Sequence, residues 1–242
     1  DIVTTRGDAL AIVDIDGIAR ETWDMEAAAQ DASITTITSN LNSRMVDSSY
    51  AATYFPNIRM RDTMNGNGTV LIAPPSVAAI GAIAKSENES QPWFAPAGFN
   101  RGGLARLGGS SGPAVVGTNL HVTKADRDVL YAANINPIAR FPSTGDTVIF
   151  GQKTLQQDRS ALDRINVRRL MIYLKRQIGI IADTILFDQN VPATWARFKG
   201  QVEPLLSDVK TRFGLTDYKV VLDEKTTTPD LIDRNILYAK IF

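Results

Sequence analysis

The sequence contains no cysteine and a single histidine, His121, among its 242 residues. The first absence excludes disulfide bonds and thiolate metal sites, and leaves the redox compartment undetermined. The second means that a Ser-His-Asp centre would depend on His121 alone. Because His121 lies between Leu120 and Val122, we interpret it as a core or interface side chain rather than a catalyst.

The chain also lacks a long apolar run and a net charge. No apolar run approaches the roughly 20 residues of a membrane-spanning helix, so we expect no membrane insertion. The 26 basic and 26 acidic residues balance, whereas nucleic-acid-binding domains are usually clearly basic, so we expect no nucleic acid partner. The chain begins without methionine and stops inside a predicted strand, so we expect a fragment of a longer protein.

Apolar runs and helical periods alternate along the chain. We predict strands at residues 9–13, 50–61, 69–72, 147–152, 218–222 and 236–242. We predict helices at 23–40, 74–85, 124–133 and 192–213, and a further helix that begins at 166. The sequence Asn-Gly-Asn-Gly at 65–68 predicts a hairpin, which makes the sheet mixed. The expected fold class is α/β, a mixed β-sheet flanked by helices on both faces. We expect a single domain over residues 1–242, with an irregular loop at 86–113.

The helix that begins at residue 166 carries an apolar stripe and a run of basic side chains. No acidic residue occurs between Arg164 and Arg176, and the basic residues lie mostly off the stripe: Arg164, Arg168, Arg169, Lys175 and Arg176. A solvated face, a surface that docks another subunit and a nucleic-acid surface are all consistent with this pattern. The last is the weakest, because no aromatic residues interleave with the charges.

Asp14-Ile15-Asp16-Gly17 follows an apolar strand and resembles the first motif of haloacid-dehalogenase-type phosphatases. In that chemistry Asp14 would be the nucleophile and Asp16 the acid/base beside Mg²⁺. The simpler interpretation is a turn after a strand, where Asp and Gly are favoured. The glycine-rich segment 102–112 lacks the Gly-Lys-Ser/Thr of a phosphate-binding loop. A Mg²⁺-dependent phosphatase therefore stays open as the alternative function.

Several segments, taken in order, resemble the core of contractile tail sheath proteins of bacteriophages. Arg6-Gly7-Asp8 precedes an apolar run that ends at Asp14, and Ala73-Pro74-Pro75-Ser76 precedes Trp93-Phe94-Ala95-Pro96-Ala97-Gly98. The segments between and after these are Ser48-Ser49-Tyr50-Ala51-Ala52 with Tyr54-Phe55-Pro56, then Asn136-Pro137-Ile138, Gly151-Gln152-Lys153-Thr154-Leu155 and Asn166-Val167-Arg168-Arg169-Leu170. Phe187-Asp188-Gln189-Asn190 ahead of Trp195, and the loop at 223–230, complete the match. The segment 101–113 departs from the family by its richness in glycine.

The resemblance implies a structural subunit of a contractile phage tail, without catalytic activity or cofactor. Such subunits stack as hexameric rings around an inner tail tube and contract to drive the tube through the host envelope. The implied partners are further copies of the chain, the inner tail tube protein and the baseplate. The implied location is the virion tail, with the host cytoplasm during assembly.

Two surfaces are expected to contact neighbouring subunits. The first is the basic set Arg164, Arg168, Arg169, Lys175 and Arg176, as one side of a charged contact. The second is the last predicted strand, with Ile236, Tyr238 and Lys240, as a site where a neighbour adds a β-strand.

Overall fold

The computed structural model describes residues 2–15, 27–62, 68–105, 114–224 and 226–242. Contacts divide the chain into two compact units, Asp1–Leu170 and Met171–Phe242. Helix α6 (Ile165–Asp183) contributes residues to both units. The expectation of one domain stays a prediction, because a shared helix does not decide whether the units fold together.

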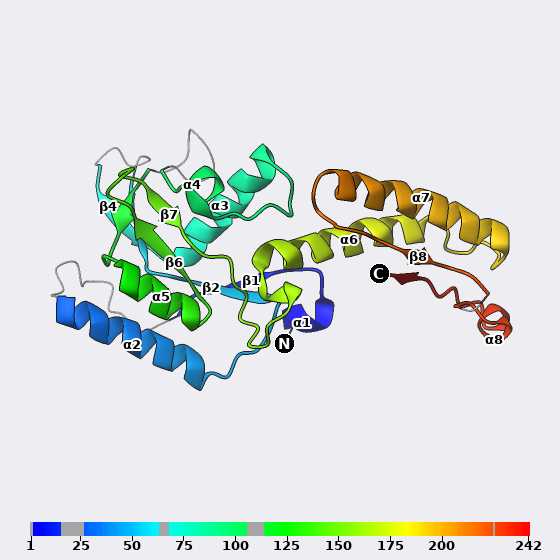
Figure 1. Ribbon diagram of the computed structural model, residues 1–242, viewed down its shortest axis with the longest axis horizontal. Helices are drawn as coiled ribbons and strands as arrows, with labels where there is room; N and C mark the ends of the chain where they lie inside the picture. The colour runs from blue at the N-terminus through cyan, green and yellow to red at the C-terminus, as the bar shows by residue number, and fades with distance from the viewer. Residues whose placement is uncertain (1, 16–26, 63–67, 106–113, 225) are drawn as a thin grey trace. The chain divides into compact units, whose positions relative to one another are not determined.

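The strands of the first unit form two sheets (Figure 1). The first sheet has the order β1 (Ala11–Val13), β2 (Ala51–Phe55), β6 (Ile135–Arg140) and β7 (Thr147–Ile149). Strands β1 and β6 run parallel to β2, whereas β7 runs antiparallel to β6. The second sheet is antiparallel, with the order β4 (Val70–Ala73), β3 (Ile58–Arg61) and β5 (Val115–Thr118). The predicted mixed α/β architecture is confirmed.

Helices cover both faces of the four-stranded sheet (Figure 1). The alternation of side chains along β2 explains this, since successive residues of a strand point to opposite faces. Ala51 and Phe55 pack in one core cluster with residues of α2 and α5, and Ala52 and Tyr54 pack in another with residues of α3. The helices of this unit are α1 (Ile2–Arg6), α2 (Ala27–Ser43), α3 (Pro75–Glu89), α4 (Gly98–Arg101), α5 (Lys124–Ala132) and a 3-10 turn at Ala161–Asp163.

Strand β6 was not predicted, and Pro137 is the reason. Proline cannot donate to a β-ladder and is rare in central strands. Here Pro137 is aligned with Phe55 of β2, and its carbonyl accepts a hydrogen bond from the Phe150 N–H at 2.8 Å. The expected strand at 147–152 is shorter than predicted, because β7 ends at Ile149.

The hairpin and the loop are only partly within the described residues. Most of the predicted turn at 65–68 lies outside them, while the flanking strands β3 and β4 pair antiparallel, as a hairpin requires. The expected irregular segment at 86–113 is partly helical, since α3 continues to Glu89 and α4 follows. Residues 106–113 of that segment lie outside the described part of the chain.

In the second unit the principal new element is α7 (Pro192–Thr211), which is followed by β8 (Val220–Val221), α8 (Pro229–Asp233) and β9 (Lys240–Ile241). Its buried face is formed by Trp195, Phe198, Val202, Leu206 and Val209. The helix predicted at 192–213 ends earlier, at Thr211, so Phe213 lies beyond the last helical turn and is 88% exposed.

The N-cap of α5 generates a stability test. The Thr123 hydroxyl accepts a hydrogen bond from the Asp126 N–H, and the Asp126 carboxylate accepts one from the Thr123 N–H at 2.7 Å. We expect Thr123→Ala to lower the free energy of unfolding by about 1 kcal/mol, since it leaves a helix N–H unpaired. Chemical denaturation measures this, with exposed Ser143→Ala as the control. Equal losses in both variants would contradict the role of the cap.

Candidate functional site

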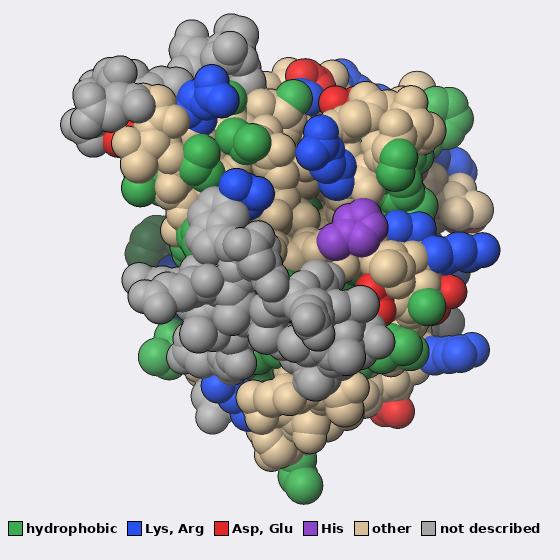
Figure 2. Space-filling view, turned by 90° about the vertical axis from the view of Figure 1, so that its left-hand side faces the viewer, with side chains coloured by type: hydrophobic (Ala, Val, Ile, Leu, Met, Phe, Trp, Pro, Cys, Tyr) green, Lys and Arg blue, Asp and Glu red, His purple; other side chains and the backbone are tan. Residues whose placement is uncertain are grey.

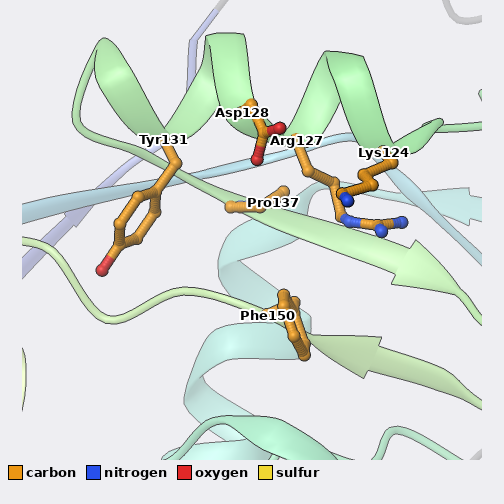
Figure 3. A pocket seen from close by; sticks show the side chains of 6 residues that line it. All are labelled: Lys124, Arg127, Asp128, Tyr131, Pro137 and Phe150. Carbon is orange, nitrogen blue, oxygen red and sulfur yellow. The ribbon is translucent and has the colours of Figure 1, made fainter.

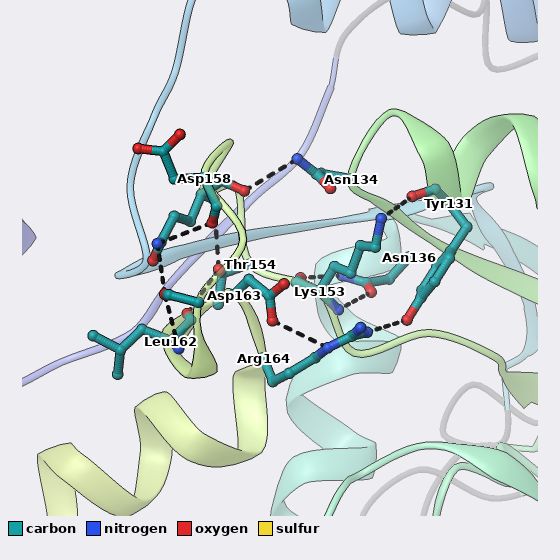
Figure 4. A network of polar contacts seen from close by, with 11 residues as sticks. Tyr131, Asn134, Asn136, Lys153, Thr154, Asp158, Leu162, Asp163 and Arg164 are labelled. Atoms are coloured by element: carbon teal, nitrogen blue, oxygen red, sulfur yellow. Dashed lines mark hydrogen bonds and ion pairs between the residues drawn. The ribbon is translucent and has the colours of Figure 1, made fainter.

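The side-chain amide of Asn136 joins three backbone segments in the interior of the first unit (Figure 4). Its Nδ2 donates to the carbonyl of Thr53 at 3.0 Å and to that of Lys153 at 2.8 Å. Its Oδ1 accepts from the Lys153 N–H at 2.6 Å. A Cβ on Gly151 would lie 2.8 Å from this oxygen, so only glycine fits there without displacement. The amide thus extends the sheet beyond the end of β7.

Lys153 and Arg164 both contact Tyr131 (Figure 4). The Lys153 Nζ donates to the Tyr131 carbonyl at 2.7 Å, and burial, followed by the charge of Arg164, lowers the pKa of Lys153. Arg164 donates to the Tyr131 hydroxyl and lies 3.1 Å from the Asp163 carboxylate. Arg164 therefore holds the start of α6 in place, although part of its side chain stays exposed.

The expected solvent-facing arginine surface is wrong at Arg168 and Arg169. These residues are only 7% and 9% exposed. Arg168 donates to the Ser49 hydroxyl, with its guanidinium 3.9 Å from the centroid of the Tyr50 ring. Arg169 lies 3.3 Å from the Glu87 carboxylate of α3, and burial lowers its pKa. The helical period places both residues off the apolar stripe. Ser49, Tyr50 and Glu87 nevertheless cover these two side chains at the start of α6.

The remaining predicted contact residues are exposed in the second unit. Lys175 and Arg176 are exposed on α6. Ile236, Tyr238 and Lys240 are exposed in the last segment, where β9 (Lys240–Ile241) pairs with β8. The predicted strand at 236–242 is therefore short. No contact with a neighbour tests these five positions, and their interfacial role stays a prediction.

The phosphatase alternative loses its nucleophile. The Asp14 carboxylate accepts hydrogen bonds from the Ser76 N–H at 3.0 Å and the Ser76 hydroxyl at 2.6 Å. Because Ser76 lies in the first turn of α3, Asp14 caps that helix from another part of the chain. Asp16 lies outside the described residues. Asp14 is thus explained by structure.

The described part of the chain was expected to hold neither a metal site nor a membrane-spanning helix, and His121 was not expected to be catalytic. Within it, no group of three His, Asp or Glu side chains is arranged to hold a metal ion. His121, shown in purple in Figure 2, is exposed on the surface. None of the described helices is both long and apolar enough to cross a membrane.

A surface cavity between α5 and the sheet was not anticipated from the sequence. It measures about 360 Å³, and its lining is formed by Lys124, Arg127, Asp128, Tyr131, Pro137 and Phe150 (Figure 3). The lining residues come from α5, from β6 and from the segment after β7. In the sequence, Tyr131 falls in the predicted helix at 124–133 and Phe150 in the predicted strand at 147–152. Neither pattern indicates that the two side chains line one cavity.

Removing the Asn136 amide tests the bridge. We expect Asn136→Ala to lower the free energy of unfolding by about 2 kcal/mol or more, because the buried Lys153 N–H and two carbonyls lose their partner. Exposed Asn42→Ala is the matched control, and chemical denaturation gives both values. A loss at Asn136 no larger than that at Asn42 would contradict the bridge.

The buried phenol of Tyr54 generates a prediction for alkaline pH. Burial raises the pKa of Tyr54, and the positive charge of Arg169 offsets part of that rise. The folded state therefore holds a proton that the unfolded chain releases above the ordinary tyrosine pKa of about 10. The buried, protonated Tyr54 therefore contributes fully to the free energy of unfolding below about pH 10, and this contribution is lost as the pH rises further.

We expect the free energy of unfolding of Tyr54→Phe to decline less above about pH 10 than that of the unmodified chain. Urea denaturation at a series of pH values measures both. Tyr238→Phe is the control, because it removes the hydroxyl of an exposed tyrosine and leaves the buried one in place. Parallel declines for Tyr54→Phe and the unmodified chain would refute this.

Known proteins were compared with the chain by sequence and by fold. No protein-family model matches it. The tail sheath protein of Vibrio phage KVP40 is 40% identical over 165 residues, which make up 67% of this chain and 23% of that protein. The tail sheath protein of Enterobacteria phage T4 is 35% identical over 169 residues, or 70% of this chain and 24% of that protein. The chain thus corresponds to about a quarter of each relative's length.

One solved structure with the same fold is the PVC sheath complex of an extracellular contractile injection system in its contracted state. Its TM-score is 0.74, at 22% identity, and the match covers 100% of this chain and 64% of that one. This likeness concerns the fold alone, whereas the sequence identity to the phage proteins concerns the family. The sequence identity to the phage proteins places the chain in the tail sheath protein family, whose members are structural proteins and not enzymes.

Proposed function

We propose that this chain is the core part of a subunit of a contractile phage tail sheath. Copies of the subunit stack as hexameric rings around the inner tail tube. On a signal from the baseplate they move to a shorter arrangement and drive the tube through the host envelope. The partners are further copies, the tube protein and the baseplate, and assembly takes place in the host cytoplasm. The sequence identity to two phage tail sheath proteins carries this proposal.

The use of polar side chains in the first unit supports a mechanical role. Asn136, Lys153, Arg168 and Arg169 are all engaged in fixed contacts within the chain. Asp14, the candidate nucleophile, is engaged with α3. A subunit held in this way moves as a rigid body, and rigid-body rotation about interfaces is a common mechanism of large rearrangements.

The exposed residues of the second unit supply the contact surfaces. Lys175 and Arg176 form one side of a charged contact with a neighbouring subunit, whereas Arg168 and Arg169 are too buried to do so. The segment with Ile236, Tyr238 and Lys240 offers backbone groups and apolar side chains to an added strand. Both surfaces lie outside the internal network of the first unit.

Electron microscopy of the intact parent protein tests the proposal. In negative stain we expect tubular assemblies, and we expect Lys175→Glu/Arg176→Glu to abolish them while the circular dichroism spectrum stays unchanged. Arg44→Glu/Arg159→Glu is the control, since it changes the net charge equally at exposed positions elsewhere. Isolated particles from the unmodified parent would refute the function. Tubes formed by the Lys175/Arg176 variant would refute only the charged contact.

A further inference from the structure

The turn between α6 and α7 exposes an apolar pair, Leu186 and Phe187. Phe187 is fully exposed, and Leu186 is 60% exposed. The backbone φ of Phe187 is +70°, in the left-handed region. A bulky residue with positive φ is uncommon and strained. Phe187 therefore combines a strained backbone conformation with a solvent-exposed aromatic ring.

Helix capping does not account for Phe187, although it does account for Phe213, the other exposed phenylalanine with positive φ. At Phe213 the Gly214 N–H donates to the Val209 carbonyl at 2.8 Å, and the Phe213 N–H to that of Lys210 at 3.1 Å. This is the Schellman pattern that ends α7. Phe187 instead occupies the third position of a turn closed by the Asp188 N–H on the Ile185 carbonyl at 3.2 Å, where Gly or Asn is usual.

The turn is held in this conformation from its C-terminal side. Asp188 pairs with Arg197 of α7. Asn190 accepts a hydrogen bond from the Trp195 indole N–H at 2.7 Å and donates to the Ile236 carbonyl at 3.1 Å. The apolar pair is thus presented by a fixed scaffold, so little conformational entropy is lost when it binds.

The surface cavity of the first unit offers a complementary site (Figure 3). Behind its Phe150 wall lie two further phenylalanines, with ring centroids 5.1 Å apart for Phe141 and Phe150 and 4.9 Å apart for Phe99 and Phe141. The Arg127 guanidinium lies 4.8 Å from the centroid of Phe141. Clustered aromatics with an arginine are typical of interface hot spots.

Size and charge match between the apolar pair and the cavity. A cavity of roughly 150 Å³ accommodates benzene, so the observed 360 Å³ has room for the Phe187 ring and part of Leu186. Exposed Lys124 lines the cavity beside Arg127 and Asp128, whereas exposed Asp183 and Asp188 flank the turn. Because Arg197 neutralises Asp188, the turn keeps the negative charge of Asp183. The cavity keeps one net positive charge, because Lys124 and Arg127 face a single acid, Asp128.

We propose that the Leu186–Phe187 turn of one copy inserts into the Phe150 cavity of a second copy. This rests on the proposed self-assembly and names one of its contacts. The two surfaces differ, so each copy offers one of each, and the contact repeats from copy to copy. Such a heterologous contact generates rings or helical filaments, which are the assemblies that a sheath requires.

Disulfide trapping tests the contact without background, because the chain has no cysteine. Differently tagged Leu186→Cys and Asp128→Cys variants, which keep the Phe187 ring and the charges of Lys124 and Arg127, are mixed, allowed to assemble and oxidised. We expect a mixed dimer on a non-reducing gel, at least about tenfold above the yield of Phe213→Cys with Asp128→Cys, since disulfides form only when the Cα atoms lie within about 7 Å. A yield no greater than that control overturns the contact.

A second measurement uses substitutions that tolerate the left-handed backbone. Phe187→Asn removes the ring while keeping a residue that adopts positive φ readily. We expect it to raise the protein concentration needed for assembly about tenfold, as loss of a hot-spot side chain does, while Phe213→Asn leaves it unchanged. Light scattering follows assembly, and thermal unfolding checks folding.

The outcomes separate this contact from the proposed function. Tubes that form equally well with Phe187→Asn overturn the contact and leave the function standing. If the unmodified parent protein forms no tubes, the proposed function fails, and trapping at high concentration still decides the contact. A mixed dimer without tubes then supports the contact, and the absence of both the mixed dimer and the tubes overturns it.

Discussion

The buried amide of Asn136 is the interaction on which the first unit depends. It binds the carbonyl of Thr53 in β2 and both backbone groups of Lys153, just after β7. The anchored segment then hydrogen-bonds onward, from the Leu155 N–H to Ala51 and from the Ile165 N–H to Gln152, each at 2.8 Å. A single buried side chain in the sheet therefore helps to fix the segment that leads into α6, because a buried polar group must be paired.

The first turns of α6 are held by packing and charge together. Ile165 is fully buried, Arg168 stacks on Tyr50, and Arg169 meets Glu87. Breaking a buried, paired arginine is more costly than breaking a surface ion pair, because the charge left behind is desolvated. The basic run that resembles a binding face thus serves largely to fix the helix, and only its later members, Lys175 and Arg176, remain accessible.

Both units bury apolar side chains, and the second also exposes several large ones. In the first, apolar side chains from both sheet faces meet helices in two core clusters. In the second, Leu186, Phe187, Tyr238 and Phe242 are all more than half exposed. Exposed apolar surface of this extent marks interaction sites in soluble proteins. Buried cores and exposed apolar residues of this kind are consistent with the proposed role in a repeating assembly.

The sequence by itself determined the local elements and the family. The strand at 11–13 and the helices α5 and α7 are each set by neighbouring residues, so periodicity predicted them. Tertiary structure alone decided the rest. Pro137 lies in a central strand, where it is aligned with Phe55 and its carbonyl accepts a hydrogen bond from Phe150, and Asp14 caps a helix 62 residues away. Arg168 and Arg169 are buried because distant residues cover them. Local patterns specify which face of an element is apolar, but burial depends on which distant segments pack there, and that information lies in the fold.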